Sequence, residues 1–437
     1  MKYVKLFQLA LKYLWRYKRR YLFLFLALSF GFTIVTLITS FKDDMYENVY
    51  KSAQDHYAGD IVVAGFDKDS VNHFHLSRHE IEAVYASLEN IGINPIHAVE
   101  RTHFGDNGIL YYNGTAVRLK YVIGVDWDNE ASYFNSLDYR SPLDVSAADE
   151  DSIVLSHPVA ELLGARQGDS LILEIDTRHG QKNTGVFIVK GIVYDSSIFG
   201  YYKVYVSRLT LNRLLLHDDN DAYMVGIYLA NRQGAERKRL LLHNELSRHI
   251  LVGPLVKDRD ELAKEMNRGS WKGIMAFVIN LPVYLSEIAD LLGAINIITY
   301  FLYGMMLLII LVSAAVTYRL LLHERAREMG TMQAIGFHEE DLRLVLIIET
   351  FALACVSIAA GFTLTFLLSS LVSLIPFSWF PGFEIFLKNG KLRSLYLPGT
   401  VLVNITAILG MMLIAVSVPA YRSLRSPLPR LLAGGDA

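Results

Sequence analysis

The sequence predicts a membrane protein with four transmembrane α-helices and a large α+β extracytoplasmic domain between the first and the second. Two observations carry this prediction. Four apolar stretches are each long enough to cross a bilayer, which takes about 20 residues. The longest segment between them has the composition of a soluble domain. The apolar stretches are 21–41, 295–318, 344–374 and 397–420.

Residues 1–20 are rich in lysine and arginine, and their apolar residues recur at helical spacing. A basic amphipathic helix suits an anionic membrane surface, so we expect an elbow helix on the cytoplasmic face. The apolar stretch 21–41 follows directly. A cleaved signal peptide is the alternative, but the apolar run is too extended and no small-residue cleavage site follows it, so we interpret the stretch as a retained anchor.

We expect residues 42–286 to form a mixed α+β domain, because strand-like and helix-like patterns alternate irregularly there. The clearest helix signal is Ser77 with Glu80 three residues later, a capping box that opens a helix to about Asn90. A second helix is bounded by a proline at its start and a glycine at its end. Strands are expected at 60–64, 117–125, 152–156, 171–176, 186–194 and 222–230, and helices at 158–164 and 235–249.

The basic residues of the remaining segments predict the topology. Lysine and arginine gather in residues 1–20, 319–343 and 421–437. Such residues favour the cytoplasmic side of the membrane, so both termini are expected there. The long domain is an exception to this charge rule, because long loops cross the membrane regardless of their charge. The expected segments are a stalk helix and second span at 287–318, a cytoplasmic loop at 319–343, the third span at 344–374, an outer loop at 375–396, the fourth span at 397–420 and a cytoplasmic tail at 421–437.

Composition and missing motifs argue against several function classes. The net charge of −2 does not support nucleic-acid binding, and the single cysteine, Cys355, permits no disulfide within the chain. No G-x-x-x-x-G-K-[S/T] loop occurs, so we expect ATP to be bound by a partner subunit and no cofactor in this chain. Hydrolase motifs such as H-E-x-x-H and G-x-S-x-G are also missing, so we do not expect an enzyme.

His73, His75 and His79 form the densest histidine cluster of the sequence. His75 and His79 would be one helical turn apart, a spacing that suits two metal ligands, if the helix began before them. Because the capping box starts the helix at Ser77, His75 falls outside it. We therefore expect no metal site.

The segment 318–337, YRLLLHERAREMGTMQAIGF, separates the second and third spans and is charged at its start. On a helix, one face would be mainly apolar and the opposite face charged. A short helix of this kind, held at a membrane surface by two spans, suits docking to a soluble partner. A solvated loop is the alternative, since charge runs usually face solvent. The first face holds Leu322, Ala326, Met329 and Gln333, and the second holds Glu324, Arg327 and Glu328.

Glu349 is the one acidic residue inside an apolar span. A charge in lipid is costly, so its side chain should face protein or lie near the headgroups, about one and a half turns past Arg343. A role in helix packing is favoured over proton transport. Small residues in the same span permit close contact with another helix. They are Ala352, Ala354, Ser357, Ala359, Ala360 and Gly361.

This order of segments resembles the FtsX-like/MacB-type permease superfamily of ABC transporters. Residues 325–336, RAREMGTMQAIG, are similar to the family's R-x-x-E-[I/M]-G-x-x-x-A-x-G loop, and Glu349 stands where the family usually has an acid. Weaker similarities lie in the extracytoplasmic domain and near the C-terminus, at 153–175, 187–195 and 426–432. A domain of this size without a fused ATPase is most similar to the lipoprotein-releasing transmembrane subunits (the LolC/LolE type).

The resemblance implies a coupling helix at 324–336 that docks into a cytoplasmic ABC ATPase dimer. Two permease chains, identical or paralogous, would pair in the bacterial inner membrane. ATP-driven closure of the ATPase would then move the outer domains, a mechanism called mechanotransmission, and would extract lipoproteins from the outer leaflet, with a periplasmic carrier as a possible further partner. The alternative is an FtsX-like regulatory subunit that activates an extracytoplasmic partner without transport. The implied coupling residues are Glu324, Arg325, Arg327, Glu328, Met329, Gly330, Gln333, Ala334 and Gly336.

Overall fold

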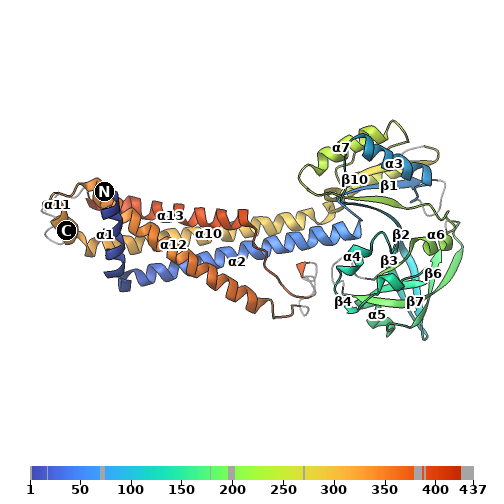
Figure 1. The fold of residues 1–437 in the computed structure, drawn as a ribbon, viewed down its shortest axis with the longest axis horizontal. Coiled ribbons are helices and arrows are strands. Elements are labelled where there is room, and N and C mark those ends of the chain that lie inside the picture. The colour runs from blue at the N-terminus through green and yellow to red at the C-terminus, as the bar shows by residue number, and fades with distance from the viewer. Residues whose placement is uncertain are drawn as a thin grey trace. The chain divides into compact units, whose positions relative to one another are not determined.

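The chain divides into two compact units in the computed structural model (Figure 1). The helical unit comprises Met1–Tyr46, Leu292–Pro376 and Lys391–Ala437, and the α/β unit comprises Glu47–Leu291 and Phe377–Gly390. The structure describes residues 2–16, 18–68, 74–177, 179–194, 202–268, 271–377, 386–387 and 390–424. Residues 426–432, which carry the C-terminal similarity, lie outside this described part.

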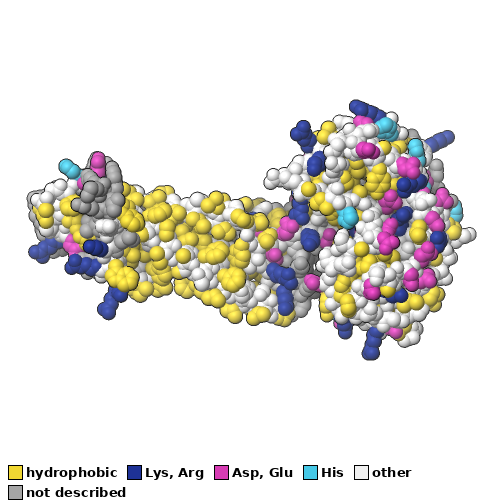
Figure 2. All heavy atoms as spheres, in the orientation of Figure 1, with side chains coloured by type: hydrophobic (Ala, Val, Ile, Leu, Met, Phe, Trp, Pro, Cys, Tyr) yellow, Lys and Arg dark blue, Asp and Glu magenta, His cyan; other side chains and the backbone are white. Residues whose placement is uncertain are grey.

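Within the described residues, four helices are long and apolar enough to cross a membrane, in agreement with the predicted number of spans. They are α2 (Lys18–His56), α10 (Ser286–Glu324), α12 (Glu339–Val372) and α13 (Pro398–Leu424), joined by the shorter α1 (Lys2–Arg16) and α11 (Ala326–Ala334). On the face shown in Figure 2, hydrophobic side chains cover most of the surface of these helices, while most acidic and basic side chains lie on the α/β unit. This contrast suits a bilayer around one unit and water around the other.

The helices of the helical unit pack around a shared apolar core. Along α2, Leu24, Leu28 and Phe32 follow at intervals of four residues and are all buried, because that spacing repeats one face of a helix. A neighbouring stripe of α2 meets the small residues of α12. Thr33 Oγ1 donates to the carbonyl oxygen of Gly361 at 3.0 Å. Small residues and side-chain hydrogen bonds are what holds helices together in lipid, where water supplies no driving force.

Ten strands of the α/β unit form one hydrogen-bonded sheet within the described residues. The order is β10-β1-β9-β2-β3-β8-β5-β7-β4, and β6 pairs with β2 and β7. Most pairs are antiparallel, but β3–β8 and β5–β7 are parallel, as befits the predicted mixed α+β domain. The strands are β1 (Ile61–Asp67), β2 (His97–Tyr112), β3 (Thr115–Val125), β4 (Tyr139–Ser141), β5 (Ser152–Ser156), β6 (Ser170–Asp176), β7 (Lys182–Val193), β8 (Lys203–Ser207), β9 (Met224–Tyr228) and β10 (Ile274–Asn280).

The long strand β2 joins two separate cores of the α/β unit. Its first residues, from His97 to Arg101, pair with β9, and its later residues pair with β3 and β6. One core lies among β1, β9, β10, α3 and α7, and the other among β2, β3, β5, β6, β7 and β8 with α5 and α6. The helices are α3 (Arg78–Asn90), α4 (Ala131–Asn135), η1 (Val145–Ala147), α5 (His157–Leu163), α6 (Arg208–Leu215), α7 (Ala235–Leu246), α8 (Arg259–Arg268) and α9 (Leu281–Tyr284).

Local signals placed several of these elements correctly. The capping box at Ser77 opens α3, with Glu80 accepting from the Ser77 backbone N–H at 3.0 Å. Gly164 ends α5 in the left-handed conformation that glycine adopts without strain. The elements not predicted from the sequence are β2, β4, β8, β10, α4, η1, α6 and α8.

Segment boundaries differ from those expected at two places. Helix α2 continues past residue 41 to His56, and its residues from Glu47 onward cluster with the α/β unit. Residues 377–390, which fall in the expected outer loop 375–396, also cluster with that unit. Asn48 Nδ2 donates to the carbonyl oxygen of Leu387 at 3.1 Å, a contact that sequence spacing could not foretell.

Candidate functional site

The segment between the second and third spans forms a corner followed by a short helix. Helix α10 ends at Glu324, Arg325 leaves the helical conformation with φ −97° and ψ 2°, and α11 begins at Ala326. The end of α11 is closed by Gly336, whose φ of +103° suits only glycine. Its N–H donates to the carbonyl oxygen of Gln333 at 3.0 Å. A chain turned at both ends holds α11 in a fixed orientation.

The predicted apolar face of this segment is turned inward. Leu322, Ala326 and Met329 are buried, and Leu322 and Met329 belong to the apolar core of the helical unit. Gly330 is also buried, and Gln333 is half-buried. These residues therefore anchor the segment to the bundle rather than present it to solvent.

Arg325 is the residue whose surroundings differ most from those expected. Only 4% of it is exposed. Its Nη1 donates to Glu349 Oε2 at 2.7 Å and to the hydroxyl of Tyr21 at 3.1 Å, and its Nη2 lies 3.3 Å from Glu349 Oε1. The guanidinium also lies 4.7 Å from the ring centroid of Tyr13. Arg325 thus ties the corner before α11 to three other helices, α1, α2 and α12.

Charge and hydrogen bonding keep Arg325 ionised in this buried position. Burial opposes its charged form, but the hydrogen bond and the attraction of Glu349 outweigh that effect, so the pKa of Arg325 is raised. Glu349 is fully buried and also accepts from the Tyr21 hydroxyl at 2.8 Å. An ion pair out of water needs such additional hydrogen bonds to offset desolvation. The acid therefore faces protein, as its cost in lipid predicted.

A second polar contact joins α10 to α12 about two helical turns before Arg325. The hydroxyl of Tyr318 in α10 is hydrogen-bonded to Thr350 Oγ1 in α12, and both side chains are buried. Together with the Arg325–Glu349 pair, this contact ties α10 and the corner after it to adjacent residues of α12, Thr350 and Glu349. No sequence pattern distinguished Tyr13, Tyr21 or Tyr318 from the other tyrosines of the chain.

The outward face of the segment combines charge with exposed apolar surface. Glu324 and Arg327 are exposed, and the side chain of Glu328 is 41% exposed, 3.9 Å from Nε of Arg325. Ala334 and Gly336 are exposed as well. Beside them Ile335 is 76% exposed and Phe337 38% exposed. The sequence analysis missed these two apolar residues, although they flank the glycine that it singled out.

Two family models match this chain, one in each half. Residues 300–428, which include the corner and α11, match the FtsX-like permease C-terminal family. Residues 22–239 match the MacB-like periplasmic core domain. This chain belongs to the FtsX/MacB-type permeases of ABC transporters. Such permeases are membrane-embedded components of transporters that work with a cytoplasmic ATPase, and they are generally not catalytic themselves.

Two solved structures are similar to part of this permease. The periplasmic region of MacB from Actinobacillus actinomycetemcomitans has 14% identity and a TM-score of 0.30, with 54% of this chain and 96% of that chain covered. A domain assigned to a permease protein from Porphyromonas gingivalis has 11% identity and a TM-score of 0.27, with 44% and 80% covered. At these TM-scores the likeness carries no further conclusion. No curated protein matches the chain.

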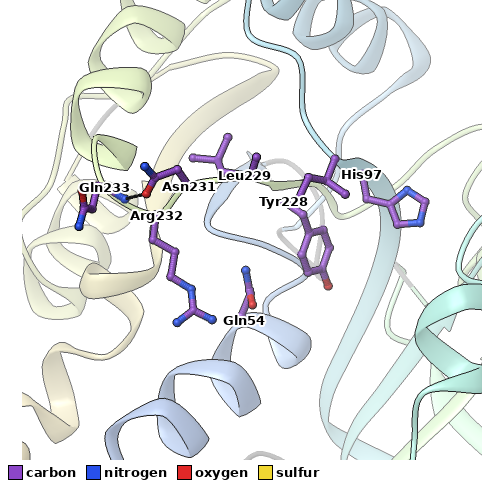
Figure 3. A pocket seen from close by; sticks show the side chains of 9 residues that line it. Gln54, His97, Tyr228, Leu229, Asn231, Arg232 and Gln233 are labelled. Atoms are coloured by element: carbon purple, nitrogen blue, oxygen red, sulfur yellow. Dashed lines mark hydrogen bonds between the residues drawn. The ribbon is translucent and has the colours of Figure 1, made fainter. Parts of the chain in front are cut away.

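The α/β unit of this permease also carries a surface hollow (Figure 3). The end of α2 contributes Gln54, and the segment after β9 contributes Asn231 and Arg232. Arg232 donates to Glu47 at 2.9 Å and stacks over the Tyr50 ring at 4.2 Å, so its charge is already partnered. The rest of the lining combines amide side chains, apolar side chains, the Tyr228 ring and His97, whose Nε2 lies 3.3 Å from the hydroxyl of Ser132.

Proposed function

We propose that this permease couples ATP hydrolysis by a separate cytoplasmic ABC ATPase dimer to movement of its α/β unit. The segment Glu324–Gly336 would be the ATPase-docking element. The bundle would lie in the bacterial inner membrane with both termini cytoplasmic and the α/β unit outside. The observation that carries the proposal is the buried Arg325–Glu349–Tyr21 contact, which fastens the docking element to two spans.

The exposed residues of α11 and of the chain on both sides of it have the composition of a docking surface. Exposed Ile335 and Phe337 provide apolar area, and Glu324 and Arg327 provide a charged border. Interfaces commonly place apolar anchors at the centre and polar residues at the rim, where charges steer and orient the partner. We therefore assign ATPase contact to the exposed residues and a positioning role to the buried Arg325.

Movement of the docking element would be transmitted through continuous helices. Because Arg325 binds Glu349 in α12 and Tyr21 in α2, a shift of α11 must move those helices or break a buried ion pair. Both α2 and α10 run without a break from residues of the helical unit into residues of the α/β unit. Rigid helices of this kind are suited to pass a small displacement over a long distance.

A second permease chain, identical or paralogous, is part of the proposal. Helix α10 has apolar residues that are exposed in the single chain, among them Ile297 at 72% and Phe301 at 69%. Such surface suits lipid or a neighbouring helix. Pairing two chains along α10 would place two docking elements opposite an ATPase dimer.

The cargo that we propose is a lipoprotein or another lipophilic molecule taken from the outer leaflet, as in the lipoprotein-releasing permeases, with delivery to a periplasmic carrier. The second candidate is a regulatory subunit that activates an extracytoplasmic partner without transport. The two differ in one observable. A transporter releases a labelled acylated protein from membrane vesicles when ATP is added, and a regulator does not.

Site-specific crosslinking tests the docking surface. A photo-crosslinking residue at position 335 should capture a polypeptide that contains an ABC ATPase phosphate-binding loop, as read from its peptide sequence. The matched control is position 96, where Ile96 is similarly exposed, at 69%, in the α/β unit. Ile335→Glu should abolish co-purification of the ATPase, whereas Ile96→Glu should leave it unchanged.

Two results would count against the proposal. Equal capture of the ATPase from positions 335 and 96 would move docking away from α11. Failure of the wild-type chain to bring down any ABC ATPase would remove the coupling function itself.

A further inference from the structure

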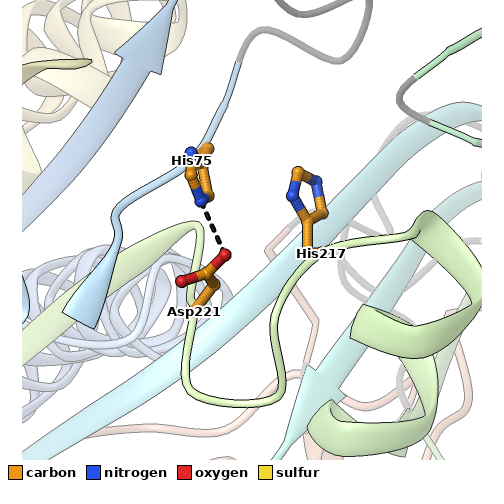
Figure 4. Close-up of side chains that lie close together, drawn as sticks. All are labelled: His75, His217 and Asp221. Atoms are coloured by element: carbon orange, nitrogen blue, oxygen red, sulfur yellow. Dashed lines mark hydrogen bonds and ion pairs between the residues drawn. The ribbon is translucent and has the colours of Figure 1, made fainter. Parts of the chain in front are cut away.

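Three potential metal ligands meet in the α/β unit (Figure 4). His75, His217 and Asp221 each offer one ligand atom, and these atoms lie within 4.8 Å of one another. Nε2 of His75 is 2.7 Å from Oδ2 of Asp221. The rings of His75 and His217 stack with their centroids 4.9 Å apart. Two imidazoles and a carboxylate therefore share one small space.

Backbone hydrogen bonds hold the ligands in register. Leu76 and Ala222 exchange both of their backbone hydrogen bonds, at 2.6 and 3.1 Å, which keeps the neighbouring His75 opposite Asp221. The N–H of His217 donates to the carbonyl oxygen of Asn212 at 2.9 Å, at the end of α6. The three ligands thus come from two segments that are far apart in sequence but fixed side by side.

The loop that carries His217 and Asp221 is braced from behind by a buried amide. Asn212 is 1% exposed, and its Nδ2 donates to the carbonyl oxygens of Asp218 at 3.1 Å and Asp221 at 2.7 Å. The N–H of Asp218 donates to Oδ2 of Asp221 at 3.1 Å, which orients the carboxylate. Supporting hydrogen bonds of this kind are typical of metal sites, where they aim the ligands.

We propose that His75, His217 and Asp221 bind a divalent transition-metal ion and that Zn²⁺ fits the site best. Zn²⁺ takes imidazole nitrogen and carboxylate oxygen at about 2.0–2.2 Å in tetrahedral geometry, so its ligand atoms lie about 3.3 Å apart. The present ligand atoms lie within 4.8 Å of one another, so small adjustments of the side chains would bring them to that spacing. His217 and Asp221 also line a surface hollow together with Asp218 and Asp219, from which water or a further ligand could reach the ion.

The charges around the cluster favour a cation. Three arginines lie close by, and Nη1 of Arg208 donates to the backbone carbonyl oxygen of Asp221 at 2.7 Å. Each of the three is paired with an acidic side chain, which offsets its positive charge. The pairs are Arg78–Glu82 at 2.9 Å, Arg208–Glu100 at 3.4 Å and Arg213–Asp219 at 2.9 Å. Asp221 contributes a negative charge of its own. A bound Zn²⁺ would join the segment before α3 to the loop before β9 and stabilise the α/β unit.

This site differs from the histidine pair that the sequence suggested. His79 lines the same hollow but lies outside the cluster, because α3 begins at Arg78 and the side chain of His79 is exposed. His73 lies outside the described residues. Asp221, which lies 146 positions after His75, supplies the carboxylate. The expectation of no metal site rested on local spacing alone, which cannot show such a partner.

Metal titration of the full-length protein in detergent tests the proposal. After treatment with a chelator, the wild-type chain should bind one equivalent of Zn²⁺ in competition with a chromophoric chelator. Co²⁺ should give the intense visible absorption of a tetrahedral site. His217→Gln should weaken Zn²⁺ binding by more than about tenfold, since even residues behind metal ligands have effects of that size. Zn²⁺ should also raise the thermal unfolding midpoint of the wild type but not of that variant.

His79→Gln is the matched control, because His79 lines the same hollow without joining the cluster, and it should bind Zn²⁺ as the wild type does. A wild-type chain that binds no stoichiometric Zn²⁺ and gives no Co²⁺ absorption would overturn the proposal. Undiminished binding by His217→Gln and His75→Gln would do so as well. If one of the two variants fails to fold, the other decides, since each removes one proposed ligand and keeps the remaining two.

Discussion

Nη1 of Arg325 lies 2.7 Å from Oε2 of Glu349, so the first residue after the second span is bound to the interior of the third span. Both side chains are withdrawn from solvent, and Tyr21 of the first span completes the contact. This contact joins three spans at the corner before α11. The position of α11 therefore depends on how those spans pack.

Replacing Glu349 by Gln should destabilise the protein strongly. The change keeps the shape but leaves the buried guanidinium of Arg325 without a counter-charge, which costs about 3 kcal/mol or more. The thermal unfolding midpoint in detergent measures the effect. Glu328→Gln is the control, since Glu328 meets the same arginine at 3.9 Å but is 41% exposed, and such pairs contribute about 1 kcal/mol at most. Equal effects of the two changes would contradict a special role for Glu349.

Gly361→Val should separate α2 from α12. A Cβ atom at Gly361 would lie 2.7 Å from the backbone oxygen of Ser29, so the two helices cannot keep their present distance. Overpacking of this kind costs about 1–3 kcal/mol. Gly410→Val in α13 is a matched control, because a Cβ there meets nothing within 4 Å. Thermal unfolding in detergent should show a lower midpoint for the first variant only.

Gly336→Ala should loosen the docking element through the backbone alone. A Cβ at this exposed position meets nothing within 4 Å, but φ is +103°, where an L-residue is strained by about 1–3 kcal/mol. We expect faster proteolysis between α11 and α12 and weaker binding of the ATPase. Gly293→Ala, inside α10 with no atom within 4 Å of the added Cβ, should not have this effect. A wild-type protease pattern for Gly336→Ala would refute the role given to this turn.

In the α/β unit, Glu130→Gln should be the most damaging conservative change that removes one charge. Arg101 is fully buried, and its Nε lies 2.9 Å from Oε2 of Glu130, which is itself 1% exposed. Loss of the carboxylate leaves a buried cation, at a cost of about 3–5 kcal/mol. Glu150→Gln removes one of the two acidic partners of the exposed Arg213 and should scarcely change stability. Chemical denaturation followed by the tryptophan fluorescence of the unit measures both variants.

The sequence by itself determined those features that rest on local physics. Apolar length fixed the four spans, because a helix must be about 20 residues long to cross a bilayer. The capping box at Ser77 and the glycine at residue 164 fixed helix ends, because capping involves residues only a few positions apart. The apolar face that holds Leu322 and Met329 followed from helical spacing, and the structure buries both residues.

Tertiary structure decided what depends on partners far apart in the chain. The sequence predicted that Arg325 is a charged residue of a surface helix. In the structure its side chain is buried, because it is hydrogen-bonded to Glu349 and Tyr21. In the same way, His75 meets Asp221 rather than His79. Apolar and polar residues do not alternate clearly along β2. Its first residues pair with β9 and its later residues pair with β3, so its surroundings change along its length. Periodicity reports which face of an element is buried, but only the packed fold brings distant charges within hydrogen-bonding distance.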